Sequence, residues 1–164
     1  MDNIFVKAFI DWLHIMATVA WIGGLFTNIF ILRPSVFKAL SPAIAVKFMG
    51  IVMKRFRIMV YTSIVILGVT GIPLKIINEN YINIINFENN WEIISFIKHI
   101  CFGILVIMAV YSFEIITPKM MKMNSNGPSP ELTQLQMKQT ILGGISFLTA
   151  IAILILSSLM RYIV

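Results

Sequence analysis

The chain has 164 residues, of which 59% are hydrophobic and only 12% are charged, and its formal net charge is +6. A water-soluble domain normally carries about 25% charged residues, so this composition excludes an ordinary soluble fold. The single cysteine excludes a disulfide within the chain and a zinc site built from cysteines. The basic residues lie mainly in the connections between apolar segments, which favours contact with a lipid bilayer and argues against a nucleic-acid partner.

Four apolar segments are long enough to cross a bilayer, which requires about 20 helical residues. They cover residues 8–32, 58–77, 93–116 and 141–162. Two helices are expected to begin earlier, because Ser41-Pro42 and Ser129-Pro130 each place a capping serine before a proline in the first turn. The predicted helices are therefore about 8–32, 42–77, 93–116 and 130–162, within one transmembrane domain over residues 1–164.

The distribution of positive charge predicts the orientation of these helices. Nine of the 13 lysine and arginine residues lie in or beside the first and third connections. By the positive-inside rule, these two connections are cytoplasmic. We therefore expect an all-α four-helix up-and-down bundle, multi-pass in the cell membrane, with both termini on the outer side.

The only two histidines occupy equivalent places in this pattern. His14 lies near the start of the first apolar segment and His99 near the start of the third. Since these two helices run in the same direction, both imidazoles are expected at one depth, toward the outer face. Ionisable side chains inside a bilayer are costly and indicate a functional site. The alternative is that each histidine simply forms hydrogen bonds at the membrane interface.

Two facing imidazoles can ligate one transition-metal ion, or both axial positions of a b haem. For copper, Met16 would add a soft ligand, and Asp11 would hydrogen-bond the outer ring nitrogen of His14. For a haem, Gly103, Gly23 and Gly24 would make room for the macrocycle, and either Lys98 or Lys75 would meet a propionate. The spacing of the histidines fits copper and haem equally well.

The first apolar segment also carries a motif, Leu13-His14 followed by Ala20-Trp21-Ile22-Gly23-Gly24-Leu25-Phe26, that resembles the first helix of CopD-like (copper resistance D-type) membrane proteins. Features in the same order continue across nearly the whole chain. They are Arg33-Pro34, Lys54-Arg55-Phe56-Arg57, Thr70-Gly71, Trp91, Lys98 and Pro118. The resemblance implies copper uptake or delivery with His14 as the principal ligand. A larger membrane complex or a copper-dependent membrane enzyme would be the partner.

A second resemblance is to the HemJ-like protoporphyrinogen oxidases, which share a histidine in the first helix, an arginine near its end and a lysine in the third. These positions are His14, Arg33 and Lys98 here. This resemblance implies a haem-binding oxidoreductase. The cofactor-binding set is then His14, His99, Lys98, Arg33, Trp21 and Gly24.

A third hypothesis is a non-catalytic packing subunit of a larger membrane complex. It would make its contacts through the small residues Gly143, Gly144 and Ser146 of the last helix.

Overall fold

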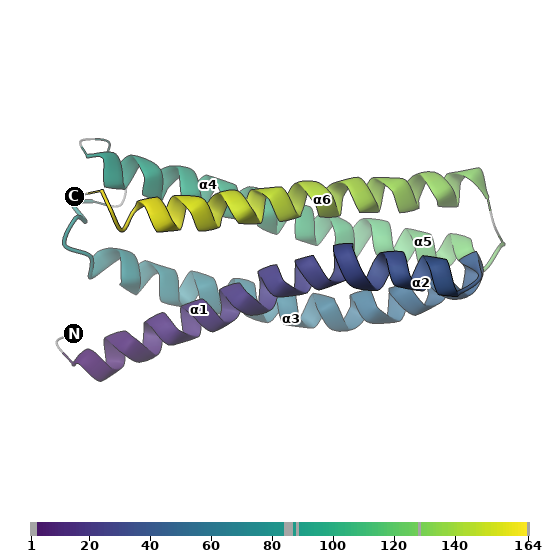
Figure 1. Ribbon diagram of the computed structural model, residues 1–164, viewed down its shortest axis with the longest axis horizontal. Coiled ribbons are helices and arrows are strands. Elements are labelled where there is room, and N and C mark those ends of the chain that lie inside the picture. The colour runs from purple at the N-terminus through teal and green to yellow at the C-terminus, as the bar shows by residue number, and fades with distance from the viewer. Residues whose placement is uncertain (1–2, 84–86, 88, 128, 164) are drawn as a thin grey trace.

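The computed structural model describes residues 3–83, 87, 89–127 and 129–163. In these residues it is all-helical, and four long segments lie side by side in an up-and-down bundle (Figure 1). This confirms the predicted fold class. Each segment is long and apolar enough to cross a membrane, so the protein is a multi-pass membrane protein. The segments are Ile4–Ala39, Pro42–Ile76, Asn90–Asn124 and Pro130–Leu159.

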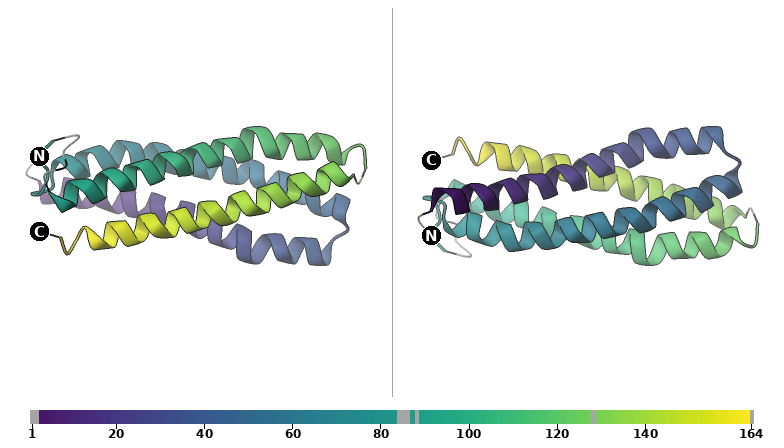
Figure 2. Two further views of the ribbon diagram at one scale, coloured as in Figure 1. Left: turned by 90° about the horizontal axis from the view of Figure 1, so that it is seen from above. Right: turned by 90° about the horizontal axis from the view of Figure 1, so that it is seen from below.

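Both described chain ends lie at one end of the bundle, which we call the terminal end (Figure 2). The second and fourth segments are single helices, α3 (Pro42–Ile76) and α6 (Pro130–Leu159), and they begin where the two Ser-Pro pairs predicted. At about 1.5 Å per residue, the 35 residues of α3 extend roughly 52 Å. This exceeds the apolar thickness of a bilayer, about 30 Å, so α3 extends beyond the apolar layer.

The first and third segments each contain a π-helix. In the first, α1 (Ile4–Phe26) passes into η1 (Thr27–Leu32) and then α2 (Arg33–Ala39). In the third, α4 (Asn90–Val110) passes into η2 (Tyr111–Ile116) and then α5 (Thr117–Asn124). The two halves of the chain therefore have the same order of elements, although the sequence shows no convincing repeat.

A proline explains each π-helix. Pro34 and Pro118 have no N–H to donate, and each lies in the first turn of the helix that follows the π segment. The residue before each proline bonds five residues back, from the Arg33 N–H to the Asn28 carbonyl and from the Thr117 N–H to the Ser112 carbonyl. The helices predicted to end at 32 and 116 therefore continue to 39 and 124.

Asparagine caps move the starts of two helices. The Asn3 side chain accepts from the N–H of Phe5, and the Asn89 side chain accepts from the N–H of Glu92. As a result α1 begins at Ile4 rather than at residue 8, and α4 begins at Asn90 rather than at residue 93.

The helices pack in pairs, α1 along α3 and α4 along α6. Gly24 marks the close approach of the first pair, because a Cβ there would lie 2.5 Å from Phe56 Cζ and 2.6 Å from Met59 Cε. All four segments meet in a central buried cluster. Its members are Trp21, Val60, Leu105, Phe113 and Ala150.

Candidate metal site at the terminal end

His14 on α1 is oriented by α3. Its Nδ1 atom lies 2.8 Å from Thr70 Oγ1, and the Thr70 hydroxyl donates its own proton to the carbonyl oxygen of Ile66 at 2.6 Å. A hydroxyl has only one proton to donate, so Thr70 must accept the hydrogen bond from His14 Nδ1–H. The neutral imidazole therefore carries its lone pair on Nε2.

The His14 ring also lies against the backbone of α3. A Cβ added at Gly71 would meet His14 Cε1 at 3.6 Å, which is ordinary van der Waals contact. Thr70 itself is buried. The imidazole is thus held by a hydrogen bond and by packing on one neighbouring helix.

His99 on α4 has the same hydrogen-bonding state. Its Nδ1 lies 2.6 Å from the carbonyl oxygen of Ser95, one turn earlier in the helix. A carbonyl can only accept, so the proton is on Nδ1 and the lone pair is again on Nε2. The His99 side chain is exposed, whereas His14 is half-buried.

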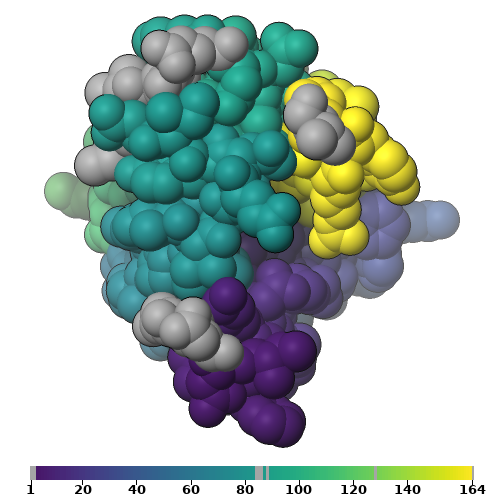
Figure 3. Space-filling view, turned by 90° about the vertical axis from the view of Figure 1, so that its left-hand side faces the viewer, coloured from purple at the N-terminus to yellow at the C-terminus, as the bar shows by residue number. Residues whose placement is uncertain are grey.

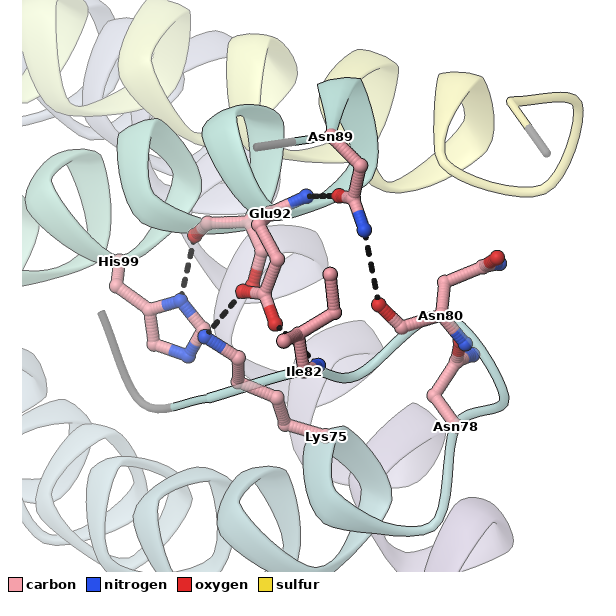
Figure 4. A network of polar contacts seen from close by, with 8 residues as sticks. Lys75, Asn78, Asn80, Ile82, Asn89, Glu92 and His99 are labelled. Atoms are coloured by element: carbon pink, nitrogen blue, oxygen red, sulfur yellow. Dashed lines mark hydrogen bonds and ion pairs between the residues drawn. The ribbon is translucent and has the colours of Figure 1, made fainter. Parts of the chain in front are cut away.

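A buried carboxylate lies beside His99 and joins three parts of the chain (Figure 4). Glu92, only 1% exposed, forms an ion pair with Lys75 Nζ at 2.9 Å, and its Oε1 accepts from the N–H of Ile82 at 3.1 Å. The start of α4 is in this way tied to the end of α3 and to the connection between them. Asn89 strengthens this junction by donating to the carbonyl of Asn80 at 3.2 Å.

The two histidines approach the terminal end from separate helices. Seen end-on, the start of α1 lies on the opposite side of the bundle from the start of α4 (Figure 3). The charges of His99 and Lys98 nevertheless act electrostatically on His14. Among the described residues, no group of three or more His, Cys, Asp or Glu is placed to hold a metal ion. Such protein side chains therefore offer at most a two-imidazole site.

The other predicted site residues on α1 differ in their surroundings, and the charge of Asp11, three residues before His14, acts on that imidazole. Asp11 is exposed, and the hydrogen bond to His14 expected from it is made by Thr70 instead. Met16 is also exposed, at 48%. Trp21 is 2% exposed in the central cluster, and Gly24 lies against Phe56.

Arg33 is far from both histidines. It follows His14 by 19 residues, which corresponds to roughly 28 Å along a helix. Its guanidinium donates to Gln139 Oε1 at 3.2 Å and to the Gln136 carbonyl at 2.7 Å. Gln139 in turn donates to Thr117 Oγ1 at 3.0 Å. Arg33 directly precedes Pro34 in the first half of the chain, and Thr117 directly precedes Pro118 in the second half. Gln139 therefore joins the two halves of the bundle.

A cavity of about 60 Å³ lies beside this network, in the middle of the bundle. Its polar lining comes from both π-helices, from α2 and from α6, while its apolar lining includes Trp21 and Leu105. The polar residues are Asn28, Arg33, Ser112, Gln139, Thr140 and Ser146. Arg33, Trp21 and Ser146 are candidate residues in the sequence, but the sequence does not predict that they line one cavity, because these contacts join different helices.

These features define a four-helix membrane protein with oriented histidines at one end and a polar network within the bundle. The chain belongs to the family described as Domain of unknown function (DUF4149), which matches residues 16–129, more than half of its length. The matched region includes His99 and Arg33 and begins two residues after His14. No curated protein and no solved structure matches the chain.

Proposed function

We propose that this protein handles copper, in uptake or delivery, through a site near the outer face of the cell membrane that is formed by His14 and His99. One observation carries the proposal: each Nδ1 donates a hydrogen bond, so each Nε2 presents its lone pair. Metal-ligating histidines almost always donate the other ring N–H in this way, because that bond fixes the tautomer and the ring orientation.

The number of protein ligands favours copper over zinc. Zinc sites usually use three or four protein ligands. The described residues offer two imidazoles without a third His, Cys, Asp or Glu. Imidazole nitrogen suits copper as well as zinc, so the small number of protein ligands is what favours copper. The resemblance to CopD-like proteins supports the same metal.

A b haem is the second candidate, and Lys98 is the observation that favours it. Lys98 is half-buried and its charge acts on both His14 and His99, which would attract an anionic propionate and repel a bare cation. A haem also brings four nitrogen ligands of its own and requires only two from the protein. Gly103, one turn beyond His99, has open space where a Cβ would lie.

The test is a titration of the detergent-purified protein with Cu(I) in competition with a chromophoric chelator. We expect His14→Ala and His99→Ala each to abolish binding at the histidine site. The site has only two protein ligands, so no other side chain replaces the one that is lost. Gln134→Ala, an exposed polar residue on α6, is the control and should bind as the wild type does. Unchanged binding in both histidine variants would contradict the proposal.

An optical spectrum before and after dithionite separates the two candidates. A Soret band with a sharp reduced α-band would assign the histidines to haem. A spectrum without these bands, from cells supplied with haem, together with histidine-dependent copper binding, supports copper handling. If the wild type binds neither, a packing role in a larger membrane complex replaces both.

A further inference from the structure

Four methionine side chains line one small pocket at the end of the bundle opposite the histidines. Met49 and Met53 come from α3, and Met120 and Met121 come from α5. Met49 and Met120 are each only 5% exposed. We call this group the methionine pocket. Elements from the two halves of the chain therefore bring four methionine residues to the lining of one pocket.

The sulfur of Met121 occupies a position made by a glycine. Gly50 on α3 is buried, and a Cβ at that residue would overlap the Sδ atom of Met121. The absence of a side chain thus lets this sulfur lie directly against the α3 backbone. A second sulfur is also held in place, because Asn28 Nδ2 donates to Met53 Sδ at 3.6 Å.

The size of the pocket limits what it can take. Its volume is about 10 Å³. A cavity needs about 10–15 Å³ to hold one water molecule, so there is room for a single ion and not for an organic ligand. The remaining lining residues are Val46, Gly50, Thr117 and Gln139, which carry no charge.

The chemistry of the lining selects the kind of ion. Thioether sulfur is a soft, neutral ligand that prefers Cu(I), whereas magnesium, calcium and manganese prefer oxygen. A site without a carboxylate also offers little to a divalent ion. Methionine is a common filler of irregular gaps between helices, so the test must separate packing from ligation.

We propose that the methionine pocket binds one Cu(I) ion through its thioether sulfurs. That copper is the ion carried in the cell rests on the proposed function. The binding itself does not, because the pocket shares no residue with the histidine site. With the basic end of the bundle in the cytoplasm, the protein would hold Cu(I) at both sides of the membrane.

Methionine-to-leucine substitutions provide the test, because exchange of these two residues nearly conserves volume and costs less than about 1.5 kcal/mol of stability. The variants are Met49→Leu/Met120→Leu and Met53→Leu/Met121→Leu, each in a His14→Ala/His99→Ala background. Met137→Leu is the matched control, because Met137 is 63% exposed on α6. Binding is measured with Cu(I) and with Ag(I) against a competing chelator.

We expect the histidine-free protein to bind one equivalent of either ion. Each double leucine variant should lower the affinity for the ion by roughly 10-fold or more. Loss of a residue that only supports a ligand already costs about that much in metal affinity. Met137→Leu should leave it unchanged. X-ray absorption of the Cu(I)-loaded histidine-free protein should show sulfur scatterers around copper. Gly50→Ala should also weaken binding, since it displaces the sulfur of Met121.

Two results would overturn the proposal. One is that the pocket variants bind as tightly as Met137→Leu does, and the other is that the histidine-free protein binds neither ion. Neither result affects the histidine site, because His14→Ala and His99→Ala are compared separately with the wild type. If the wild type and the histidine variants all bind one equivalent of Cu(I), the histidine site is contradicted and the methionine pocket is still supported.

Discussion

The Nδ1 atom of His14 and the Oγ1 atom of Thr70 lie 2.8 Å apart, and this contact joins α1 to α3 at the proposed copper site. The Thr70 hydroxyl is committed to the Ile66 carbonyl, so it can only accept from the imidazole. The orientation of His14 is therefore set by a residue 56 positions away in the sequence.

Replacing Thr70 by valine should weaken copper binding without removing a ligand. Valine has nearly the shape of threonine but cannot accept the hydrogen bond, so the His14 ring loses its fixed tautomer. Supporting partners of this kind typically contribute about 10–100-fold to metal affinity. We expect a loss in that range in the Cu(I) competition titration, and wild-type binding in Thr70→Ser. Equal affinities for the valine and serine variants would show that this bond does not position the ligand.

Replacing Glu92 by glutamine should destabilise the terminal end. The substitution removes the charge of Glu92 from its ion pair with Lys75, and breaking a buried ion pair costs about 3–5 kcal/mol. We expect a lower thermal unfolding midpoint in detergent. Glu79→Gln removes an exposed acid from the same connection and is the control. A midpoint like that of the control would mean that the pair contributes little.

Two adjacent glycines allow a direct test of the contact between α1 and α3. A Cβ at Gly24 would collide with Phe56 and Met59, whereas a Cβ at Gly23 would meet nothing within 4 Å. Overpacking typically costs about 1–3 kcal/mol, so Gly24→Ala should lower the unfolding midpoint. Gly23→Ala should leave it unchanged or raise it, because alanine favours helix more than glycine does. The opposite order would contradict the packing described here.

The helices could be predicted from the sequence because their causes are local. Apolar runs of sufficient length gave the four spans, and the Ser41-Pro42 and Ser129-Pro130 pairs located two starts correctly. The continuation past Pro34 and Pro118 was missed, because a proline usually ends a helix unless a π-helix accommodates it.

The site was less predictable because its contacts are long-range. Depth alone placed His14 and His99 at the same end of the bundle, and this agrees with the structure. The partner of His14 was expected to be Asp11, one turn away on the same helix, but it is Thr70 on another. The pairing of α1 with α3 and of α4 with α6 decides such contacts, and no periodicity within one helix reveals it.

The network around Gln139 should contribute to stability across the two halves of the bundle. Gln139 is 8% exposed and bonds both Arg33 and Thr117, so Gln139→Leu removes one hydrogen-bond partner from each of them. Each buried unsatisfied polar group costs about 1–3 kcal/mol. Thermal unfolding should show a clear loss of stability for Gln139→Leu and none for Gln134→Leu, which is exposed on the same helix. Similar unfolding midpoints for the two variants would mean that the hydrogen bonds of Gln139 contribute little to stability.

The orientation in the membrane can be tested with single cysteines in a Cys101→Ala background. Asn78 lies in the connection at the terminal end and Ser125 in a connection at the opposite end, and both are exposed. The positive-inside rule predicts that an impermeant maleimide labels Asn78→Cys in intact cells and labels Ser125→Cys only after lysis. The reverse pattern would place the histidines on the cytoplasmic side.

The number of Cu(I) equivalents that the protein binds shows whether His14 and His99 form one copper site. The measurement compares the wild type with His14→Ala/His99→Ala, both purified in the same detergent and titrated against the same chelator. We expect two equivalents for the wild type and one for the variant, which keeps the methionine pocket. Equal numbers of equivalents in the two proteins would contradict it.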